Sequence, residues 1–485
     1  MPVITNIYDL KRLHKIRTPK MFYDYCESGS WTEQTFRENV TDFDKIRLRQ
    51  RIAVDMTGRS TASKMIGQDV AMPVALAPVG LTGMQRADGE IKAAKAAAKF
   101  GVPFTLSTMS ICSIEDVAEH TDKPFWFQVY TLKDDDFMRR LIARATDAKC
   151  SALVITVDLQ IMGQRHKDLK NGLSAPPKLT PKSIANMMTK AQWGLEMLGT
   201  KRRFFGNIVG HAKGVTNPSS LSAWTAEAFD QSLDWNRIAE LRRMWDGPVI
   251  LKGILDAEDA KQAANIGADA IVVSNHGGRQ LDGALSSIRM LPEIMDAVGD
   301  KIEVHLDSGI RSGQDVLKAL ALGAKGTYIG RAFVHGLGAM GEAGVTKALE
   351  VIQKEMDTTM ALCGRRTVDQ VDRDMVLVPE DFAGRNPRQT PQPRVRVNES
   401  TAGMITESIP ATHKNATRKP KWSDTKPMVE GPTKKPTKPN IHAREMARLR
   451  WRRDTRLPKR EVAVGTITAM PIAVTAIPNS AIGWV

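Results

Sequence analysis

The sequence predicts an α/β protein, a (β/α)8 barrel of the TIM type with a long insertion after strand 4 and a disordered basic C-terminal tail. Three observations carry this prediction. Short apolar runs alternate with helical patterns from Met72 onward, which is typical of parallel βα units. Eight such units can be counted, and unusual polar residues follow the runs, where barrel active sites lie. The 485 residues allow one large core and leave segments outside it.

The apolar runs are the expected strands. They are Val74 to Ala77, Phe104 to Ser107, Phe125 to Val129, Ala152 to Val157, Val249 to Lys252, Ala270 to Ser274, Ile302 to Asp307 and Gly326 to Gly330. Helical patterns fall between them, for example from Glu90 to Phe100. A second example runs from Ala257 to Gly267 and ends at a glycine, a common helix C-terminal residue.

The insertion, residues 160–234, separates the fourth strand from the next helix. It contains P-P-K-L-T-P from Pro176, an amphipathic stretch from Ser183 to Gly199, and the basic run K-R-R-F-F from Lys201. A loop this long is usually functional or mobile. Met, Trp and Leu beside basic residues favour an interfacial helix on a bilayer surface. A lid packed over the active site is the alternative, and one segment can do both.

The C-terminal tail, residues 385–485, has a different composition from residues 1–384, which we take as the barrel domain. The tail is rich in Pro, Lys, Arg and Thr, a composition typical of disorder. It holds 20 Lys and Arg against 7 Asp and Glu, whereas the rest of the chain holds 49 against 47. Its segment from Ala443 to Arg453 favours a basic helix that binds nucleic acid or anionic lipid. An appended segment without function is the alternative.

The cysteines and the N-terminus indicate a cytoplasmic protein. Four cysteines lie far apart with no C-x-x-C pair, which argues against a zinc site and against a disulfide framework. The N-terminus lacks the apolar core of a signal peptide, and no run reaches the ~18 apolar residues that span a bilayer. We therefore expect no metal, no export and no membrane span.

The run S-N-H-G-G-R-Q-L-D-G, from Ser274 to Gly283, directly follows the sixth expected strand. His276 can take a proton near neutral pH. The glycines Gly277 and Gly278 let the backbone approach a ligand, and Arg279 offers a planar fork to a carboxylate. This combination indicates proton abstraction from a small organic acid. A satisfied loop histidine beside a surface arginine is the alternative, and it does not account for the whole run.

Polar residues gather at the predicted C-terminal rim of the barrel. In strand order they are Pro78, Ser107, Gln128 with Tyr130, Thr156 with Asp158, Lys252, Ser274 with His276, Asp307, and Gly330 with Arg331. Polar residues with only structural roles would not gather at one rim. The loops after strands seven and eight usually bind phosphate in such barrels. Here the backbone N–H groups of Gly309 and Gly330 and the guanidinium groups of Arg311 and Arg331 can cradle a phosphomonoester.

The run from Ser274 resembles the active-site sequence of the FMN-dependent α-hydroxy-acid dehydrogenases and oxidases. The resemblance extends from about Ile4 to Val378 and includes P-K-M-F-Y-D-Y from Pro19, M-P-V-A-L-A-P-V-G from Met72 and D-S-G-I-R-S-G from Asp307. Within that family the chain is most similar to the bacterial respiratory L-lactate dehydrogenases.

The resemblance implies FMN as cofactor and oxidation of an L-2-hydroxy acid, L-lactate to pyruvate first of all, with quinone or cytochrome as electron acceptor. Oxidation by O2 is the alternative within the enzyme class. It also implies a peripheral protein on the cytoplasmic side of the inner membrane, and a homo-oligomer, as a tetramer.

The resemblance also assigns roles to residues. Lys252 lies by the flavin N1/O2 edge, where a positive charge favours the anionic reduced ring. The loops after strands seven and eight bind the FMN phosphate. Side chains and backbone groups at the rim hydrogen-bond the rest of the isoalloxazine edge. The first set is Asp307, Ser308, Gly309, Arg311, Gly330 and Arg331; the second is Ser107, Gln128, Thr156 and Ser274, with the backbone of Pro78, Val79 and Gly80.

For the substrate, the resemblance implies that Arg165 and Arg279 bind the α-carboxylate. Tyr25 and Tyr130 are the hydroxyl donors. Asp158 pairs with His276 and stabilises the imidazolium that forms as the proton leaves. His276 takes either the α-carbon proton or the hydroxyl proton, with hydride transfer in the second case.

One position departs from the family pattern, because Gln160 stands where a proline is usual. Asp158, Gly163 and Arg165 keep their spacing, so we expect activity with an altered loop geometry.

Two rival interpretations are weaker. G-L-G-A-M-G from Gly336 to Gly341 satisfies the dinucleotide pattern G-x-G-x-x-G, but it lies inside the expected last barrel helix, where the match carries little weight. The second rival is a catalytically dead barrel whose basic tail binds nucleic acid or membrane. The complete set of charged rim residues argues against it, so nucleic acid is not an expected partner.

Overall fold

The computed structural model describes residues 2–173, 180–216, 224 and 227–383. The tail of residues 385–485, with its basic segment from Ala443, lies outside the described residues, as does most of the Pro-rich run from Pro176. The predictions of disorder and of a basic helix there stay predictions.

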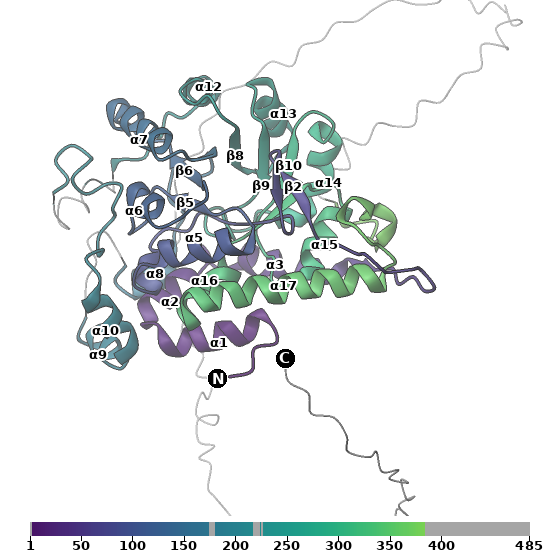
Figure 1. Ribbon diagram of the computed structural model, residues 1–485. Coiled ribbons are helices and arrows are strands. Elements are labelled where there is room, and N and C mark those ends of the chain that lie inside the picture. Colours follow the sequence, from purple (N-terminus) through teal and green to yellow (C-terminus); the bar gives the residue numbers. More distant parts are fainter. Residues whose placement is uncertain (1, 174–179, 217–223, 225–226, 384–485) are drawn as a thin grey trace, which may run out of the picture. The chain divides into compact units, whose positions relative to one another are not determined.

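Eight parallel strands form a barrel (Figure 1). They are β4 (Val74–Leu76), β5 (Thr105–Ser107), β6 (Trp126–Tyr130), β7 (Ala152–Thr156), β8 (Val249–Ile254), β9 (Ala270–Val273), β10 (Glu303–Leu306) and β11 (Gly326–Ile329). Seven neighbouring pairs are hydrogen-bonded in order from β5 round to β4, through β11. A parallel bridge between Leu76 and Phe104 links β4 to β5 and closes the ring. The predicted (β/α)8 barrel is confirmed, with every predicted strand present.

The barrel interior is filled by small and branched side chains around two large rings. The rings of Trp126 and Tyr328 lie 5.9 Å apart and pack among buried residues such as Ala152 and Val272. A hairpin of β2 (Ser63–Met65) and β3 (Gln68–Val70) belongs to the same cluster. The hairpin covers the end where the strands begin, because Gln68 accepts a hydrogen bond from Trp126 at the start of β6. The predicted polar rim residues lie at the opposite end of the barrel, where the strands end.

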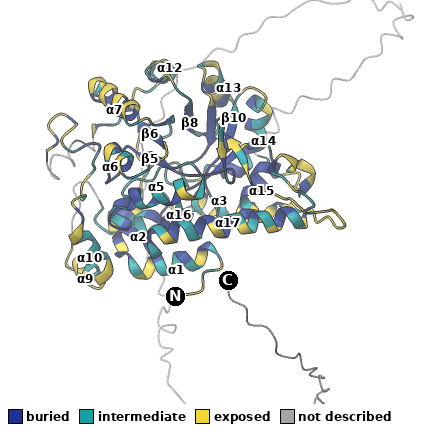
Figure 2. Ribbon diagram, in the orientation of Figure 1, coloured by how far each residue is buried: buried dark blue, intermediate teal, exposed yellow. Residues whose placement is uncertain are grey.

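Eight helices follow the strands around the barrel. They are α5 (Gly89–Phe100), α6 (Ile114–Glu119), α7 (Asp135–Asp147), α12 (Trp235–Arg243), α13 (Ala257–Asn265), α14 (Ser287–Val298), α15 (Gly313–Ala321) and α16 (Arg331–Met340). Helix α7 shows why such segments fold: Asp134 caps its N-terminus, and Phe137, Leu141 and Ile142 fall on one buried face. Figure 2 shows the resulting two-sided burial of these helices.

Two more helices join α16 in covering the barrel on the side of the N-terminus. Helices α1 (Ile7–Arg17), α16 and α17 (Glu342–Leu362) lie side by side (Figure 1). Gly336 and Gly338 of the G-x-G-x-x-G pattern lie in α16, as predicted, and allow this packing, whereas Gly341 follows the end of the helix. A Cβ at Gly338 would come within 2.0 Å of the His14 ring, and one at Gly336 within 2.2 Å of the Gly344 carbonyl oxygen. These glycines therefore serve helix packing.

The remaining elements are short. They are α2 (Lys20–Cys26), α3 (Gln34–Thr41), α4 (Thr82–Gln85), the strand pair β1 (Arg47–Leu48) and β12 (Val376–Leu377), and 3-10 turns at Asp42–Lys45, Val368–Gln370 and Arg373–Met375. Within the described ranges, no helix combines the length and apolar character needed to cross a membrane. All four cysteines are buried with free thiols.

The insertion forms α8 (His166–Lys170), α9 (Pro181–Met188) and α10 (Ala191–Gly199). The prediction of one interfacial helix from Ser183 to Gly199 is wrong in this respect, because the stretch breaks at Lys190, where the backbone leaves the helical conformation. The Lys190 ammonium donates to the Ile16 carbonyl at 2.7 Å. Asn186 accepts from the backbone N–H of Lys20 at 2.7 Å. These contacts with the α1–α2 segment hold the bend.

Removal of residues 385–485 is expected to leave the barrel folded, because all eight strands and every candidate site residue precede them. The melting temperature and cofactor content of the truncated chain should match those of the full chain. Salt-dependent binding to heparin should weaken, because the tail carries most of the excess positive charge. A clear drop in melting temperature would show that the tail packs on the barrel and would move the domain boundary.

Candidate active site

The loop that follows β9 carries three consecutive residues with left-handed backbone. His276, Gly277 and Gly278 have φ angles of 56°, 69° and 72°. A Cβ at Gly277 would lie 2.7 Å from an Arg331 nitrogen, and one at Gly278 would lie 2.5 Å from the Phe36 backbone. The glycines thus admit neighbouring protein groups, whereas the sequence predicted close approach of a ligand. A histidine with positive φ is uncommon and marks this loop as a candidate functional site.

His276 is held by Asp158, as predicted. Its Nδ1 lies 2.9 Å from Asp158 Oδ1, so Nδ1–H donates to the carboxylate and Nε2 is left as the acceptor. Gly253 makes room for this carboxylate, since a Cβ there would come within 2.6 Å of Asp158 Cγ. Burial lowers the pKa of His276 below its ordinary value, and the Asp158 carboxylate opposes that shift. The imidazole is therefore neutral at pH 7 and available as a base.

Two arginines lie together above His276 on the substrate side. Arg279 Nη1 donates to the Tyr25 carbonyl at 2.5 Å and to Ser28 Oγ at 2.9 Å. Its guanidinium also lies 4.6 Å from the centre of the Tyr25 ring. Arg165 donates to the Arg279 carbonyl at 3.3 Å. Among the described residues, the buried Nη2 of Arg279 has no hydrogen-bond partner. Burial, with repulsion from Arg279, lowers the pKa of Arg165 to about 10, so Arg165 stays charged at pH 7.

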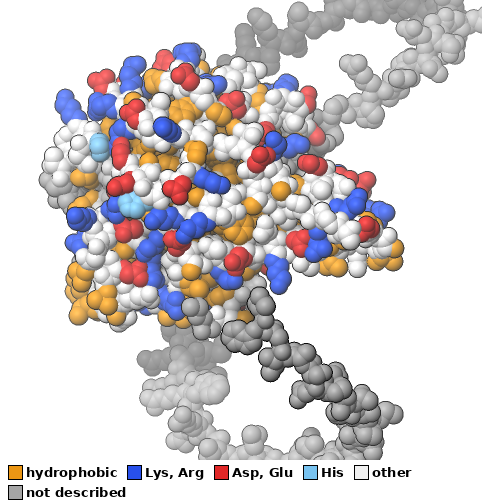
Figure 3. Space-filling view, in the orientation of Figure 1, with side chains coloured by type: hydrophobic (Ala, Val, Ile, Leu, Met, Phe, Trp, Pro, Cys, Tyr) orange, Lys and Arg blue, Asp and Glu red, His pale blue; other side chains and the backbone are white. Residues whose placement is uncertain are grey.

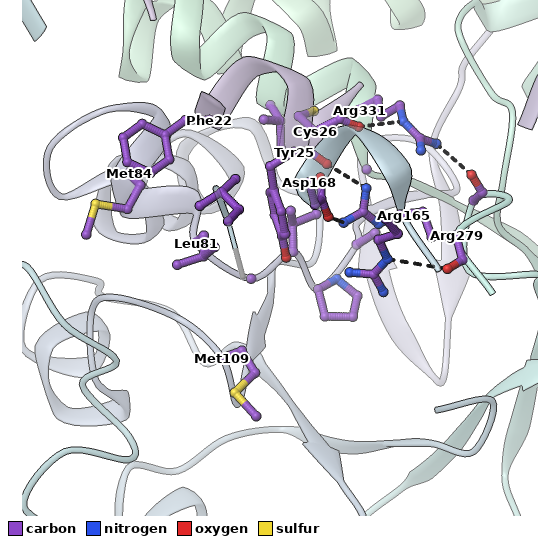
Figure 4. A pocket seen from close by; sticks show the side chains of 18 of the residues that line it. Phe22, Tyr25, Cys26, Leu81, Met84, Met109, Arg165, Asp168, Arg279 and Arg331 are labelled. Carbon is purple, nitrogen blue, oxygen red and sulfur yellow. Dashed lines mark hydrogen bonds and ion pairs between the residues drawn. The ribbon is translucent and has the colours of Figure 1, made fainter. Parts of the chain in front are cut away.

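A third charged residue at this position was missed by the sequence analysis. Asp168 lies on α8 with Oδ2 3.9 Å from Arg279 Nη2, and Ser28 donates to its Oδ1 at 3.3 Å (Figure 4). Burial raises the pKa of Asp168, while Arg279 and Arg165 oppose the shift. Its position three residues after Arg165 in a helical pattern was the available signal, since such residues share a helix face.

The two tyrosines line the same cavity from different elements. Tyr25 comes from α2, and Tyr130 ends β6. A Cβ at Gly80 would come within 3.3 Å of the Tyr25 hydroxyl, which places that hydroxyl beside the loop after β4. Burial raises the pKa of Tyr130 well above its ordinary value, so its hydroxyl keeps its proton. Both hydroxyls can donate to an oxygen of a ligand.

Lys252 forms a charged cluster at the end of β8. Its ammonium lies 2.6 Å from Asp307 Oδ2 and 3.1 Å from Ser274 Oγ, and its side chain is 5% exposed. Burial of Asp307 would raise its pKa, but Lys252 outweighs this and lowers it. A buried, fixed ammonium at the rim suits the electron-rich edge of a reduced ring.

The other polar rim residues are buried at the strand ends. Ser107 donates to Gln128 Oε1 at 3.1 Å, and Thr156 pairs with Lys252 in the register of β7 and β8. The amide nitrogen of Gln128 is buried, and no group in the described part of the chain accepts from it. A buried donor without a partner indicates a ligand acceptor. This donor and the Lys252 ammonium fit the FMN that the resemblance implies.

The residues predicted to bind a phosphate lie together, but one side chain does not point as predicted. Ser308 and Gly309 have φ angles of 81° and 99°, and they line the cavity together with Asp307, Arg311, Gly330 and Arg331. The Arg331 side chain, however, donates to the carbonyls of Cys26, Gly277 and Ser28 at 2.8, 3.0 and 2.8 Å. It thereby ties the catalytic loop to the end of α2. Its backbone N–H, at the first position of α16, has no acceptor within the helix and suits a phosphate.

Many of these residues line one cavity of about 1330 Å³ at the C-terminal end of the barrel, among them Tyr25, Tyr130, Arg165, Lys252, His276, Arg279 and the residues of the predicted phosphate site. Ser107, Gln128, Thr156, Ser274 and Asp158 are not part of its lining. The loop after β4, with Pro78, Val79 and Gly80, forms part of its wall. Figure 4 shows that Arg165, Arg279 and Arg331 gather on one side of Tyr25, while Phe22, Leu81 and Met84 lie on the other. The cavity therefore has a charged end and an apolar end.

Gln160, the departure from the family pattern, donates to the Leu233 carbonyl at 2.6 Å and links the two ends of the insertion. Asp158 and Arg165 still reach the site. Gly163 is needed between them, because a Cβ there would come within 2.6 Å of the Arg279 carbonyl oxygen.

Comparison with known proteins identifies the family of the chain. Residues 14–378 match the FMN-dependent dehydrogenase family. An L-lactate dehydrogenase of Caulobacter sp. (strain K31) is 45% identical over 375 residues, which is 77% of this chain and 98% of the relative. An L-lactate dehydrogenase of Azorhizobium caulinodans is 46% identical over 377 residues, 77% of this chain and 99% of the relative.

Solved structures show the same fold. A monotopic membrane protein, (S)-mandelate dehydrogenase, superposes with a TM-score of 0.75 at 33% identity, covering 78% of this chain and all of the other. A mandelate oxidase superposes with a TM-score of 0.65 at 35% identity, covering 77% of this chain and 98% of the other. The family match spans the barrel and every candidate residue, so the predicted family is confirmed. This chain is an enzyme that uses FMN and belongs to the family of FMN-dependent dehydrogenases.

Proposed function

We propose that this chain oxidises L-lactate, or a similar L-2-hydroxy acid, to the 2-oxo acid and passes the electrons to quinone or cytochrome. One arrangement carries the proposal. The guanidinium groups of Arg165 and Arg279 lie together, and the buried Nη2 of Arg279 has no hydrogen-bond partner among the described residues. In the same cavity lies the neutral imidazole of His276, which is hydrogen-bonded to the Asp158 carboxylate. Two guanidinium groups suit a carboxylate, and a neutral imidazole suits removal of a proton from the neighbouring carbon or hydroxyl.

Each residue then has a defined task. Arg165 and Arg279 hold the carboxylate, and Tyr25 and Tyr130 donate to substrate oxygens. His276 Nε2 takes the proton, and Asp158 stabilises the imidazolium that results. FMN, when bound, accepts the two electrons. Whether the proton leaves carbon or oxygen, the same residues are used.

The cofactor residues keep their proposed roles on the same basis. Lys252 serves the N1/O2 edge, and Gln128, with its unmet amide donor, serves another ring acceptor. Ser107, Thr156 and Ser274 complete the ring edge with the backbone of Pro78, Val79 and Gly80. The phosphate falls to Asp307, Ser308, Gly309, Arg311, Gly330 and the backbone of Arg331.

Anaerobic mixing of the FMN-loaded protein with L-lactate tests the proposal. Loss of the oxidised flavin absorbance with formation of one pyruvate per flavin is the expected result. Reoxidation by a quinone, a cytochrome and O2, measured in parallel, then identifies the acceptor. A flavin that no L-2-hydroxy acid reduces would contradict the proposal, and reoxidation fastest with O2 would make the chain an oxidase.

We also propose peripheral attachment to the cytoplasmic side of the inner membrane. The outer surface of the insertion supports membrane attachment, and the side follows from the family resemblance alone. Ile184, Met188, Leu195 and Leu198 on α9 and α10 are exposed. Figure 3 shows apolar side chains gathered over these helices, with Lys and Arg side chains nearby. An exposed apolar face bordered by positive charge is typical of interfacial helices. The insertion also covers the cavity, so its predicted roles as lid and as membrane contact are compatible.

The double variant Leu195→Glu with Leu198→Glu is expected to release the protein from anionic vesicles, because two carboxylates on the exposed face oppose contact with lipid. Flotation of the FMN-loaded protein with such vesicles measures the effect. The matched control is Ile52→Glu, which adds a charge at a residue that is 81% exposed but outside the insertion. Equal flotation of all three proteins would assign lipid contact to another segment.

We also propose domain limits and an assembly. Residues 1–384 form the catalytic domain, with residues 160–234 as its insertion and 385–485 as a separate tail. A tetramer follows from the family resemblance alone, and sedimentation of the full chain tests it.

A further inference from the structure

The apolar end of the cavity is not explained by lactate. We call it the apolar chamber and define it by Phe22, Leu81, Met84, Met187, Trp193 and Met197, all of which line the cavity. The side chain of lactate is one methyl group, whereas ligand sites usually measure ~300–1,000 Å³. At about 1330 Å³, the cavity exceeds that range. FMN and lactate are assigned to the polar groups at the other end, so the chamber has room for a further apolar group.

The chamber is a built structure, since the insertion is fixed onto the barrel around it. The rings of Phe22 on α2 and Trp193 on α10 lie 5.7 Å apart. The Trp193 indole donates to the Met84 carbonyl at 2.9 Å, which joins α10 to α4. The buried Arg86, directly after α4, forms an ion pair with Glu196 of α10, with Nε 2.6 Å from a carboxylate oxygen. These contacts hold one face of α9 and α10 toward the cavity.

The chamber opens on the exposed apolar face of the insertion. Met188 and Leu198 line the cavity, yet they are 79% and 75% exposed. A side chain that is both lining and exposed lies at an opening. The cavity therefore runs from the arginine pair, past Tyr25 and through the chamber, to an apolar surface.

This layout selects a ligand class. At one end Arg165 and Arg279 suit a carboxylate, and at the adjoining end the six chamber residues offer apolar contacts, including the adaptable side chains of three methionines. The complementary ligand carries a carboxylate head and an apolar tail. A quinone or another uncharged apolar acceptor fits the chamber but leaves the buried Nη2 donor of Arg279 without an acceptor.

We propose that this enzyme oxidises L-2-hydroxy acids with medium or long alkyl chains, whose tails occupy the apolar chamber. The proposal rests on the proposed function, because the chemistry at C2 is the same. The hydroxyl carbon loses two electrons and two protons to become the 2-oxo acid, and FMN and then the acceptor take the electrons. The tail contributes binding only, and it enters from the exposed apolar face.

A chain-length series tests the proposal with the FMN-loaded full chain. The kcat/KM for flavin reduction by L-2-hydroxy acids of three to eight carbons should rise about two- to fourfold per added methylene, as expected for transfer of methylene groups from water into an apolar site. Titration with 2-oxooctanoate, followed by the flavin absorbance change, should show tighter binding than pyruvate. A flat series in both measurements would overturn the proposal.

Charged substitutions on the two faces of α10 provide the matched comparison. Met197→Glu places a carboxylate in the chamber, and Leu195→Glu places one on the outer face of the same helix, where Leu195 is 71% exposed. The first should lower kcat/KM for L-2-hydroxyoctanoate at least tenfold and leave L-lactate unchanged. The second should change neither value, and Met197→Leu should match the wild type.

The outcomes separate this inference from the proposed function. If lactate reduces the flavin in every variant but Met197→Glu does not discriminate against the octanoate, the chamber does not hold the tail. If Met197→Glu instead weakens only the reaction with a decyl-tailed quinone, the chamber serves the acceptor and the inference is wrong. If no 2-hydroxy acid of any length reduces the flavin, the proposed function itself fails.

Discussion

Replacement of His276 by Gln is expected to slow flavin reduction by L-lactate about 10²- to 10⁴-fold, the usual effect of losing a general base. The imidazole is the neutral base of the site, held by Asp158 at 2.9 Å, and an amide cannot accept the proton in its place. Flavin content should not change, because the His276 side chain is assigned to the substrate proton and not to cofactor binding. Stopped-flow absorbance under anaerobic conditions measures the rate, and the spectrum of the purified protein measures the flavin.

The pH profile gives a second signature of the same residue. Burial lowers the pKa of His276, so the base form prevails at neutral pH and is lost only as the pH falls through a value below 6.5. The wild-type rate of flavin reduction should therefore be flat near pH 7 and decline on the acidic side. In His276→Gln that decline should disappear. A variant within a few-fold of the wild-type rate, with the decline intact, would remove His276 from the mechanism.

The fold was predictable because its signal is local. Most residues of the barrel strands are buried, so the strands appear as short and largely apolar runs, most clearly in Ala270–Val273. The polar residues at the strand ends follow from the same regularity, since all parallel strands point their C-termini to one rim. His276, Lys252 and Asp307 could be placed at one site for this reason, before any distance was known.

What could not be predicted depends on contacts between segments distant in sequence. Arg331 was expected to use its guanidinium on phosphate, but the side chain reaches the carbonyls of Cys26 and Ser28, some 300 residues away in sequence. Asp168 was missed because its partner Arg279 lies on a different loop. The break at Lys190 depends on α1, which supplies the carbonyl that fixes it. Periodicity carries no information on such pairings.

Replacement of Arg279 by Lys is expected to lower kcat/KM for L-lactate about 10- to 100-fold, the equivalent of one or two charge-assisted hydrogen bonds. Lysine keeps the charge but loses the planar fork, and the fork has two tasks here. Nη1 holds Tyr25 and Ser28, while Nη2 is left with an unmet donor for the substrate carboxylate. Steady-state kinetics with flavin content as the control measures the change. Unchanged affinity and turnover would mean that Arg165 alone holds the carboxylate.

Asp168→Asn is the matched variant, with an expected effect of opposite sign. The Asp168 carboxylate lies 3.9 Å from Arg279 Nη2, where it offsets part of the positive charge that attracts the substrate. The amide is nearly isosteric and uncharged, so the arginine pair should bind anions more tightly. Titration of the oxidised enzyme with pyruvate, followed by the flavin absorbance change, should therefore give a lower Kd in Asp168→Asn and a higher one in Arg279→Lys. If both variants weaken pyruvate binding, Asp168 acts mainly by positioning Arg279, because the loss of its charge then matters less than the loss of its contact.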